Sequence, residues 1–154
     1  MISNKRILLT GGAGFIGTAL TERLYRQNEV VILDLLRRNA LSEAGLDRAA
    51  TVTLIQGDVR DADQVREAMK GCQCVVHLAS IAGVDTVIQN PVLTMQVSLM
   101  GTLNVLEAAR ELGIEDGFVR DVQQARGELL ASHMGADGRL MEWAEAFKDS
   151  ENGG

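Results

Sequence analysis

The glycine-rich stretch at residues 6–17, Arg-Ile-Leu-Leu-Thr-Gly-Gly-Ala-Gly-Phe-Ile-Gly, constrains the fold of this chain more than any other part of the sequence. A short apolar run at 7–9 has the character of a buried strand, and a helical pattern of apolar residues begins at Phe15. Two glycine spacings coexist between them, G-x-G-x-x-G at Gly12, Gly14 and Gly17 and G-x-x-G-x-x-G at Gly11, Gly14 and Gly17. The sequence therefore predicts a strand, a tight turn and a helix.

Such a turn is suited to binding a phosphate group. Residues without Cβ permit the sharp turn and let backbone N–H groups approach a pyrophosphate, and the N-terminus of the next helix directs further donors at the same anion. Taken alone, the pattern also fits a purely structural turn. A P-loop is excluded, because Thr18 follows Gly17 where that motif needs a lysine.

A carboxylate stands where a dinucleotide site needs one. Residues 30–33 form a continuous apolar run, which is typical of a strand covered on both faces of a parallel sheet, and Asp34 ends it. Asp34 lies 20 residues after Gly14, close to the spacing at which dinucleotide-binding folds place a carboxylate for the adenosine ribose. A surface aspartate at a strand end is the alternative, and the upstream glycine turn favours the ribose role.

Further strand and helix patterns complete the fold prediction. Residues 51–56 predict a third strand, 63–69 a helix capped by Asp61, and 74–78 a fourth strand. The alternation of strands and helices implies right-handed crossovers and a parallel sheet, most simply in the order 3-2-1-4. The predicted fold class is α/β: a Rossmann-like half of about four strands with flanking helices, followed by an α-helical C-terminal tail.

Composition and charge argue against nucleic acids and membranes as partners of this chain. The chain has 154 residues and a formal net charge of −6, so it lacks the basic surface that nucleic-acid binding requires. No apolar run approaches the ~20 residues of a membrane span, and no signal peptide is visible, so we expect no membrane partner and a cytoplasmic location. Cys72 and Cys74 are expected to be small buried residues, because a disulfide between them would be strained.

These motifs resemble those of the extended short-chain dehydrogenase/reductases, the NAD-dependent sugar-nucleotide epimerases and dehydratases. The resemblance covers about residues 5–112 and rests on Thr10 to Gly17, Asp34, Gly57 to Asp61, His77 to Ser80, Asn90-Pro91 and Gly101 to Arg110. It implies that Asp58 and Val59 border the adenine. It also implies that Leu78, Ala79 and Ser80 run beside the ribose and nicotinamide. The full predicted cofactor-binding set is Gly11, Gly14, Phe15, Ile16, Gly17, Asp34, Asp58, Val59, Leu78, Ala79 and Ser80.

NAD is the expected cofactor, and no metal site is predicted. The carboxylate of Asp34 would repel the 2′-phosphate of NADP. Arg37 and Arg38 leave NADP open as the less favoured alternative, since a nearby arginine accommodates that phosphate.

The chain departs from the family pattern at the catalytic residues. The resemblance implies a Tyr-x-x-x-Lys pair, in which the tyrosine acts as general acid or base and the lysine lowers its pKa. The only tyrosine is Tyr25, and the residue four positions later is a glutamate. The lysines are Lys5, Lys70 and Lys148. We therefore predict no catalytic residue, and whether the chain is an enzyme stays open.

Residues 91–112 are the longest predicted helix. Its apolar side chains are assigned to two directions, with Leu99, Leu103 and Leu106 toward the sheet and Val92, Met95 and Met100 elsewhere. In the family that the chain resembles, the corresponding helix builds a dimer interface. A homodimer through this helix, or through the open sheet edge beside the fourth strand, is therefore a candidate, and simple packing on the sheet is the alternative.

The remaining residues, 113–154, differ in composition and are predicted to form a helical segment appended to a dinucleotide-binding domain at 1–112. Residues 135–149, mainly Asp137 to Trp143, resemble a fragment of the family 95 glycoside hydrolases, the α-L-fucosidases, and the stretch before them fits more loosely. The helical barrel of that family is far larger than this segment, so its hydrolytic activity is not expected. We interpret the chain as a chimera joined near 109–113.

Three functions follow from this interpretation. The favoured one is an NAD-binding module derived from a sugar-nucleotide epimerase or dehydratase, without the Tyr/Lys pair. The second is an epimerase, dehydratase or oxidoreductase with a non-standard acid or base such as His77 or Asp85, although a histidine in an apolar strand is more often a hydrogen-bonded core residue. The third is a chimeric or designed fold without ligand function, for which changes at Gly14 or Asp34 would alter no activity.

Overall fold

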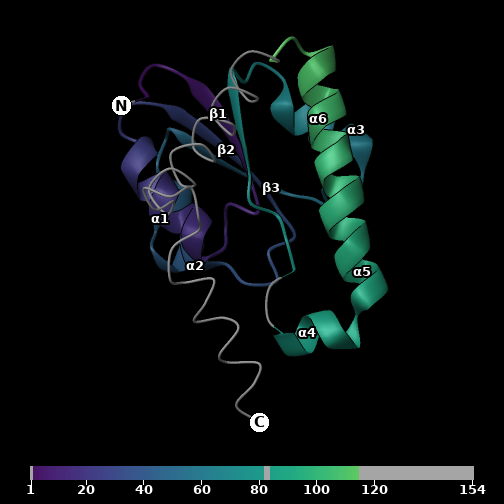
Figure 1. The fold of residues 1–154 in the computed structure, drawn as a ribbon. Coiled ribbons are helices and arrows are strands. Elements are labelled where there is room, and N and C mark those ends of the chain that lie inside the picture. The colour runs from purple at the N-terminus through teal and green to yellow at the C-terminus, as the bar shows by residue number, and fades with distance from the viewer. Residues whose placement is uncertain (1, 82–83, 115–154) are drawn as a thin grey trace, which may run out of the picture. The chain divides into compact units, whose positions relative to one another are not determined.

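A four-stranded parallel sheet forms the centre of the fold (Figure 1). The computed structural model describes residues 2–81 and 84–114. The strands are β1 Arg6–Thr10, β2 Glu29–Asp34, β3 Val52–Gln56 and β4 Cys74–His77. They pair in the order β3-β2-β1-β4, and every pair is parallel. The predicted fold class and strand order are confirmed.

Helices connect the strands and cover both faces of the sheet. Figure 1 shows α1 and α2 on one side and α3 and α6 on the other. The α-helices are α1 Phe15–Leu24, α2 Ala40–Glu43, α3 Ala62–Met69, α4 Val84–Gln89, α5 Pro91–Met95 and α6 Gly101–Glu111. A 3-10 turn spans Leu46–Arg48, and a π-helical turn, Gln96–Met100, joins α5 to α6. Asp61 caps α3 as predicted, because its carboxylate accepts the N–H groups of Asp63 and Gln64.

The strands alternate their side chains between two apolar layers. In β1, Leu8 packs in the layer that α3 and α6 cover, whereas Ile7 and Leu9 pack in the layer that α1 and α2 cover. β2 is buried from Val30 to Leu33, so it reads as a continuous apolar run rather than an alternating one. Cys72 and Cys74 are also buried, as expected.

The orientation of α6 differs from the expectation. Leu99, Leu103 and Leu106 were expected to face the sheet but are 61%, 54% and 41% exposed. The buried residues of this helical run are Val97, Gly101, Val105, Ala108 and Ala109. Small residues bring the helix close to its neighbours, and a Cβ added at Gly101 would lie only 2.8 Å from Val59 Cγ2. The expectation was wrong because leucines and small residues both recur at helical spacings, so the sequence defines two possible buried faces. The helix buries the face with the small residues, which allows closer packing.

The helical run Pro91–Glu111 is long and apolar enough, by length and composition alone, to span a membrane. It has 21 residues, a mean hydropathy of 1.2 over its most apolar window, and 28% of that window buried. The expectation that no apolar run approaches the length of a membrane span is therefore not supported. Core helices of soluble proteins pass the same test of length and composition, and α6 packs against α3 and β4.

The predictions for the tail fall on residues 115–154, outside the described part of the chain. These predictions are the second family resemblance, the helical segment and the chimeric origin. Of the predicted segment, only Gly113 and the buried Ile114 are described. The division into a domain at 1–112 and an appended segment stays a prediction.

The orientation of α6 can be tested with two substitutions on the same helix. Val105→Ala is expected to lower the free energy of unfolding by about 2 kcal/mol, because it removes two buried methyl groups and leaves a cavity. Leu103→Ala is expected to change it by less than about 0.5 kcal/mol, because that side chain is exposed. Urea denaturation at one low protein concentration measures both values. The reverse order would mean that the leucine face is the buried one.

Candidate functional site

The residues predicted to bind the cofactor meet at the carboxyl edge of the sheet. The glycine turn follows β1, Asp34 is the last residue of β2, Asp58 and Val59 follow β3, and Leu78 follows β4. Because all four strands are parallel, their carboxyl ends lie at the same edge of the sheet. Backbone bonds join neighbouring turns, since the Gly11 N–H donates to the Leu33 carbonyl and the Gly57 N–H to the Asp34 carbonyl.

Glycine is required at two positions of the turn. Gly11 has φ +69°, in the left-handed region, and a Cβ there would lie 2.7 Å from the backbone of Ala79. A Cβ at Gly17 would lie 2.4 Å from the backbone of Gly12. Gly11 thus brings the ends of β1 and β4 together, and Gly17 lets α1 lie tightly against the turn.

The N-terminus of α1 is open to an anion. Gly14 is the N-cap residue, so no side chain caps the helix, and the first turn contains no acidic residue. Phe15 and Ile16 are 86% and 68% exposed. Ile16 therefore does not pack on the sheet, although its spacing with Leu20 and Leu24 suggests an apolar helix face. Early N–H groups of a helix have no partner within the helix and are suited to a phosphate group.

Asp34 organises the turns on both sides of β2. Its Oδ2 accepts the N–H of Ala13 at 3.1 Å, and its Oδ1 accepts the N–H of Leu36 at 2.8 Å. The second bond holds Leu36 at φ 58°, an uncommon conformation for a leucine. A carboxylate has about four acceptor positions, so Asp34 keeps capacity for the hydroxyl groups of a ribose.

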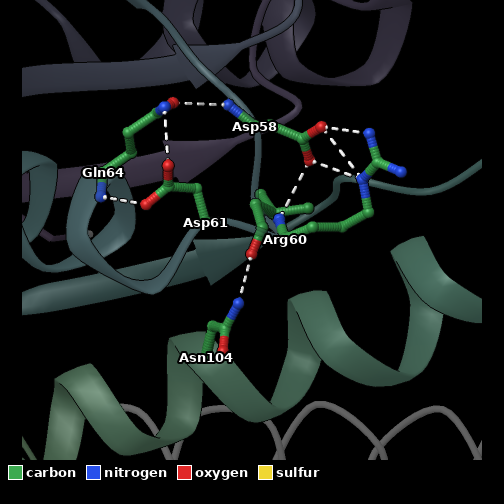
Figure 2. A network of polar contacts seen from close by, with 6 residues as sticks. Asp58, Arg60, Asp61, Gln64 and Asn104 are labelled. Atoms are coloured by element: carbon green, nitrogen blue, oxygen red, sulfur yellow. Dashed lines mark hydrogen bonds and ion pairs between the residues drawn. The ribbon is translucent and has the colours of Figure 1, made fainter.

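Asp58 forms an ion pair with Arg60, two residues later (Figure 2). The backbone N–H of Arg60 donates to Oδ1 at 2.9 Å, and its guanidinium donates through Nε and Nη2 to the carboxylate at 2.5–3.1 Å. These hydrogen bonds are the main cause that lowers the pKa of Asp58, against a smaller opposing effect of burial. The carboxylate therefore stays charged through the neutral and mildly acidic range.

The turn after β3 leaves one backbone donor unused. The N–H of Asp58 donates to Gln64 Oε1, that of Arg60 to Asp58 Oδ1, and that of Asp61 to the Asp58 carbonyl. The N–H of Val59 has no partner among the described residues. A backbone N–H without a partner in the protein is free to donate to a ligand or to water.

An open groove of about 530 Å³ lies beside this turn. It is lined by Asp58, Arg60, Asp61, Gln64, Gln96 and Met100. Arg60 and Gln64 were not predicted as site residues, although Arg60 belongs to the motif that identified Asp58. Gln96 and Met100 come from a helix far along the sequence, and no local pattern connects them with the turn.

The fourth part of the site lies after β4. His77 is half-buried, and its Nδ1 lies 2.5 Å from the Oγ1 of Thr10, which is fully buried. The Ala79 N–H donates to the same hydroxyl oxygen at 3.4 Å, so the Thr10 hydroxyl links the end of β1 to both His77 and Ala79. His77 is thus a hydrogen-bonded core histidine, as the sequence favoured. Leu78 and Ala79 are half-buried and Ser80 is exposed.

A parallel sheet in the order β3-β2-β1-β4, with a glycine turn after β1 and a carboxylate ending β2, defines a Rossmann-like α/β protein. Residues 7–123 match the family described as "NAD dependent epimerase/dehydratase family". The chain belongs to this family. The predicted resemblance of its N-terminal part is therefore confirmed.

Relatives of known name agree with this assignment. The chain is 36% identical over 112 residues to dTDP-glucose 4,6-dehydratase of Mycobacterium tuberculosis, which covers 71% of this chain and 34% of the relative. It is 32% identical over 111 residues to a putative UDP-glucose 4-epimerase of Methanocaldococcus jannaschii, with 71% and 35% covered. The chain thus spans about a third of the length of these relatives.

Solved structures show the same fold. A UDP-N-acetylglucosamine 4-epimerase from Methanobrevibacter ruminantium aligns with a TM-score of 0.67 at 28% identity, covering 73% of this chain and 36% of the other. The UDP-glucose 4-epimerase of Thermus thermophilus, solved in complex with NAD, aligns with a TM-score of 0.58 at 35% identity, covering 71% and 35%.

The burial of His77 predicts a pH dependence of stability. Desolvation lowers the pKa of His77 below its ordinary value of about 6.5, so the unfolded chain takes up a proton before the folded one does. As the pH falls below about 6.5, the free energy of unfolding should therefore decrease, by at most about 1.4 kcal/mol per pH unit for one proton. Above that pH the contribution is constant.

Urea denaturation between pH 5 and 8 measures this effect. His77→Gln is the comparison, because it removes the titrating group. The variant is expected to lose the part of the slope that begins near pH 6.5. Parallel profiles for the two proteins would contradict the assignment of the slope to His77.

Proposed function

We propose that this chain is an NAD-binding module derived from a sugar-nucleotide epimerase or dehydratase. The observation that carries the proposal is the unused N–H of Val59 next to the charged carboxylate of Asp58. Family membership and the NAD-bound structural relative support the same cofactor. The proposed site residues are Gly11, Gly14, Phe15, Ile16, Gly17, Asp34, Asp58, Val59, Leu78, Ala79 and Ser80.

Asp58 and Val59 together match one edge of adenine. Adenine presents an amino group that donates and a neighbouring ring nitrogen that accepts, so it needs an acceptor and a donor side by side. Three N–H donors of Arg60 make four hydrogen bonds to the Asp58 carboxylate, and the two from Nε share one hydrogen, so one acceptor position is only partly engaged. That position would receive the amino group, and the Val59 N–H would bind the ring nitrogen.

The rest of the dinucleotide fits the other turns. Asp34 would accept the hydroxyl groups of the adenosine ribose, and the N-terminus of α1 would bind the pyrophosphate. Leu78, Ala79 and Ser80 would border the nicotinamide half. A bound nicotinamide supplies hydride transfer, and the protein residues bind and orient it. NAD is favoured over NADP because Asp34 already carries a negative charge beside the ribose position, although Arg37 and Arg38 are exposed nearby.

We also propose that the chain binds NAD without turning over a sugar nucleotide. The only tyrosine, Tyr25, follows the C-terminal end of α1, whereas the glycine turn precedes the N-terminal end of that helix. The alternative acid or base, His77, already has Thr10 as hydrogen-bond partner. Steady turnover of UDP- or dTDP-sugars, abolished by His77→Gln in folded protein, would favour an epimerase or dehydratase with a non-standard acid or base.

Asp34→Asn provides the test of cofactor binding. The change removes the charge and one acceptor, so the affinity for NAD is expected to fall about ten-fold or more, and the preference for NAD over NADP should shrink. The control is Glu29→Gln, because Glu29 is the exposed first residue of the same strand at the opposite edge. Calorimetric titration measures both cofactors. Equal affinities for all three proteins would contradict the ribose role of Asp34.

We further propose that the chain forms a homodimer through the exposed apolar face of α5 and α6. This face consists of Val92, Met95, Leu99, Met100, Leu103 and Leu106. A contiguous exposed apolar surface of this kind marks an interaction site. The helix that builds a dimer interface in the resembled family corresponds to this one.

Light scattering after size exclusion tests the dimer. Leu99→Lys is expected to weaken dimerisation at least about ten-fold, because a charge enters the apolar face. Glu107→Lys is the control, since it introduces the same residue at another exposed position of α6. A wild-type protein that stays monomeric at high concentration, or identical masses for both variants, would overturn the proposal.

A further inference from the structure

The turn that carries Asp58 and Val59 is attached to a helix far away in the sequence. The side-chain amide of Asn104, on α6, donates from Nδ2 to the carbonyl oxygen of Val59 at 2.9 Å (Figure 2). The two residues are 45 positions apart, and Asn104 is half-buried. In Figure 2 this is the only dashed line that leads from α6 to the turn.

With the Asn104 hydrogen bond, both polar groups of the Val59–Arg60 peptide have a side-chain partner. The carbonyl of Val59 is bound by Asn104, and the N–H of Arg60, in the same peptide plane, donates to Asp58 Oδ1 at 2.9 Å. One rigid peptide therefore connects Asn104 to the Asp58 carboxylate. A shift of this peptide would turn both the carboxylate and the backbone of Val59.

The side chain of Val59 is held by the same helix. Gly101 lies three residues before Asn104, so both residues share a face of α6. The absence of a side chain at Gly101 lets the helix backbone approach Val59 closely, as the 2.8 Å distance from an added Cβ to Val59 Cγ2 indicates. Val59 is thus held through its carbonyl and its side chain, whereas its N–H has no partner among the described residues.

We propose that Asn104 is a positioning residue for adenine recognition: it holds the Val59–Arg60 peptide so that the Val59 N–H and the Asp58 carboxylate face the same base. The inference rests on the proposed NAD binding and assigns the specificity for the base to a contact outside the predicted site residues. Asn104 does not touch the ligand. It determines which base the turn accepts, rather than how strongly the phosphates are bound.

The experiment compares NAD with nicotinamide hypoxanthine dinucleotide. Hypoxanthine replaces the amino group by an oxygen and carries a hydrogen on the neighbouring nitrogen, so its donor and acceptor are exchanged at both contacts. Calorimetric titration of the 154-residue chain is expected to give a preference for NAD of about ten-fold or more, since a site with paired polar groups rejects the mismatched analogue. In Asn104→Leu the preference should fall below about three-fold. The affinity for the hypoxanthine analogue should stay within about two-fold, because it depends on the ribose and phosphate contacts.

Two further variants sharpen the comparison. Asn104→Asp keeps the size of the side chain but removes the donor, so it should show the same loss of preference, and it replaces Asn104→Leu in the test if that variant does not fold by circular dichroism. Thr102→Val is the matched control, because it removes a hydrogen bond to the Ser98 carbonyl on the exposed side of the same helix. It should keep the wild-type preference.

The outcomes separate the two proposals. An unchanged preference in the Asn104 variants overturns the positioning role and leaves NAD binding intact. An equal loss of affinity for both dinucleotides also overturns it, because that pattern indicates a purely structural contact. A wild-type chain that does not bind NAD overturns the proposed function and, with it, this inference. A wild-type chain that binds both dinucleotides equally well overturns the adenine contact of Asp58 and Val59 and the role of Asn104, while the phosphate site stands.

Discussion

The close approach of β1, β2 and β4 at their carboxyl ends is the constraint on which the rest of the site depends. Gly11 lies so near the backbone of Ala79 that no side chain fits between them, and its N–H is bound to the carbonyl of Leu33. These contacts of Gly11 fix the position of the glycine turn, and therefore the position of the N-terminus of α1. Asp34 strengthens this arrangement by accepting the N–H of Ala13. A carboxylate that would bind the ribose thus also holds the protein around it.

The turn after β3 uses a second kind of organisation, a network of polar side chains. Gln64 and Asp61 hold the first turn of α3, Arg60 neutralises Asp58, and Asn104 attaches the turn to α6 (Figure 2). Almost every donor of the turn has a partner within the protein. Among the described residues, the N–H of Val59 is the one backbone donor of this turn without a partner.

Much of the fold was accessible from the sequence because its signals are local. The apolar runs marked the strands, Asp61 marked the start of α3, and the spacing from the glycines to Asp34 marked the dinucleotide pattern. The face of α6 was not accessible in this way. Leu103 and Val105 are both apolar, and Val105 is the buried one because it lies on the side of α6 that packs closely, where Gly101 meets Val59.

The sequence by itself determined the order of elements, the parallel sheet and the family, since each depends on residue types at fixed spacing along the chain. The tertiary structure decided which groups meet at the carboxyl edge and which of them stay available. The link from Asn104 to Val59 joins residues 45 positions apart, and the pairing of Thr10 with His77 joins residues 67 positions apart. No local pattern encodes such contacts, because they exist only after the crossovers have brought distant strands and helices together.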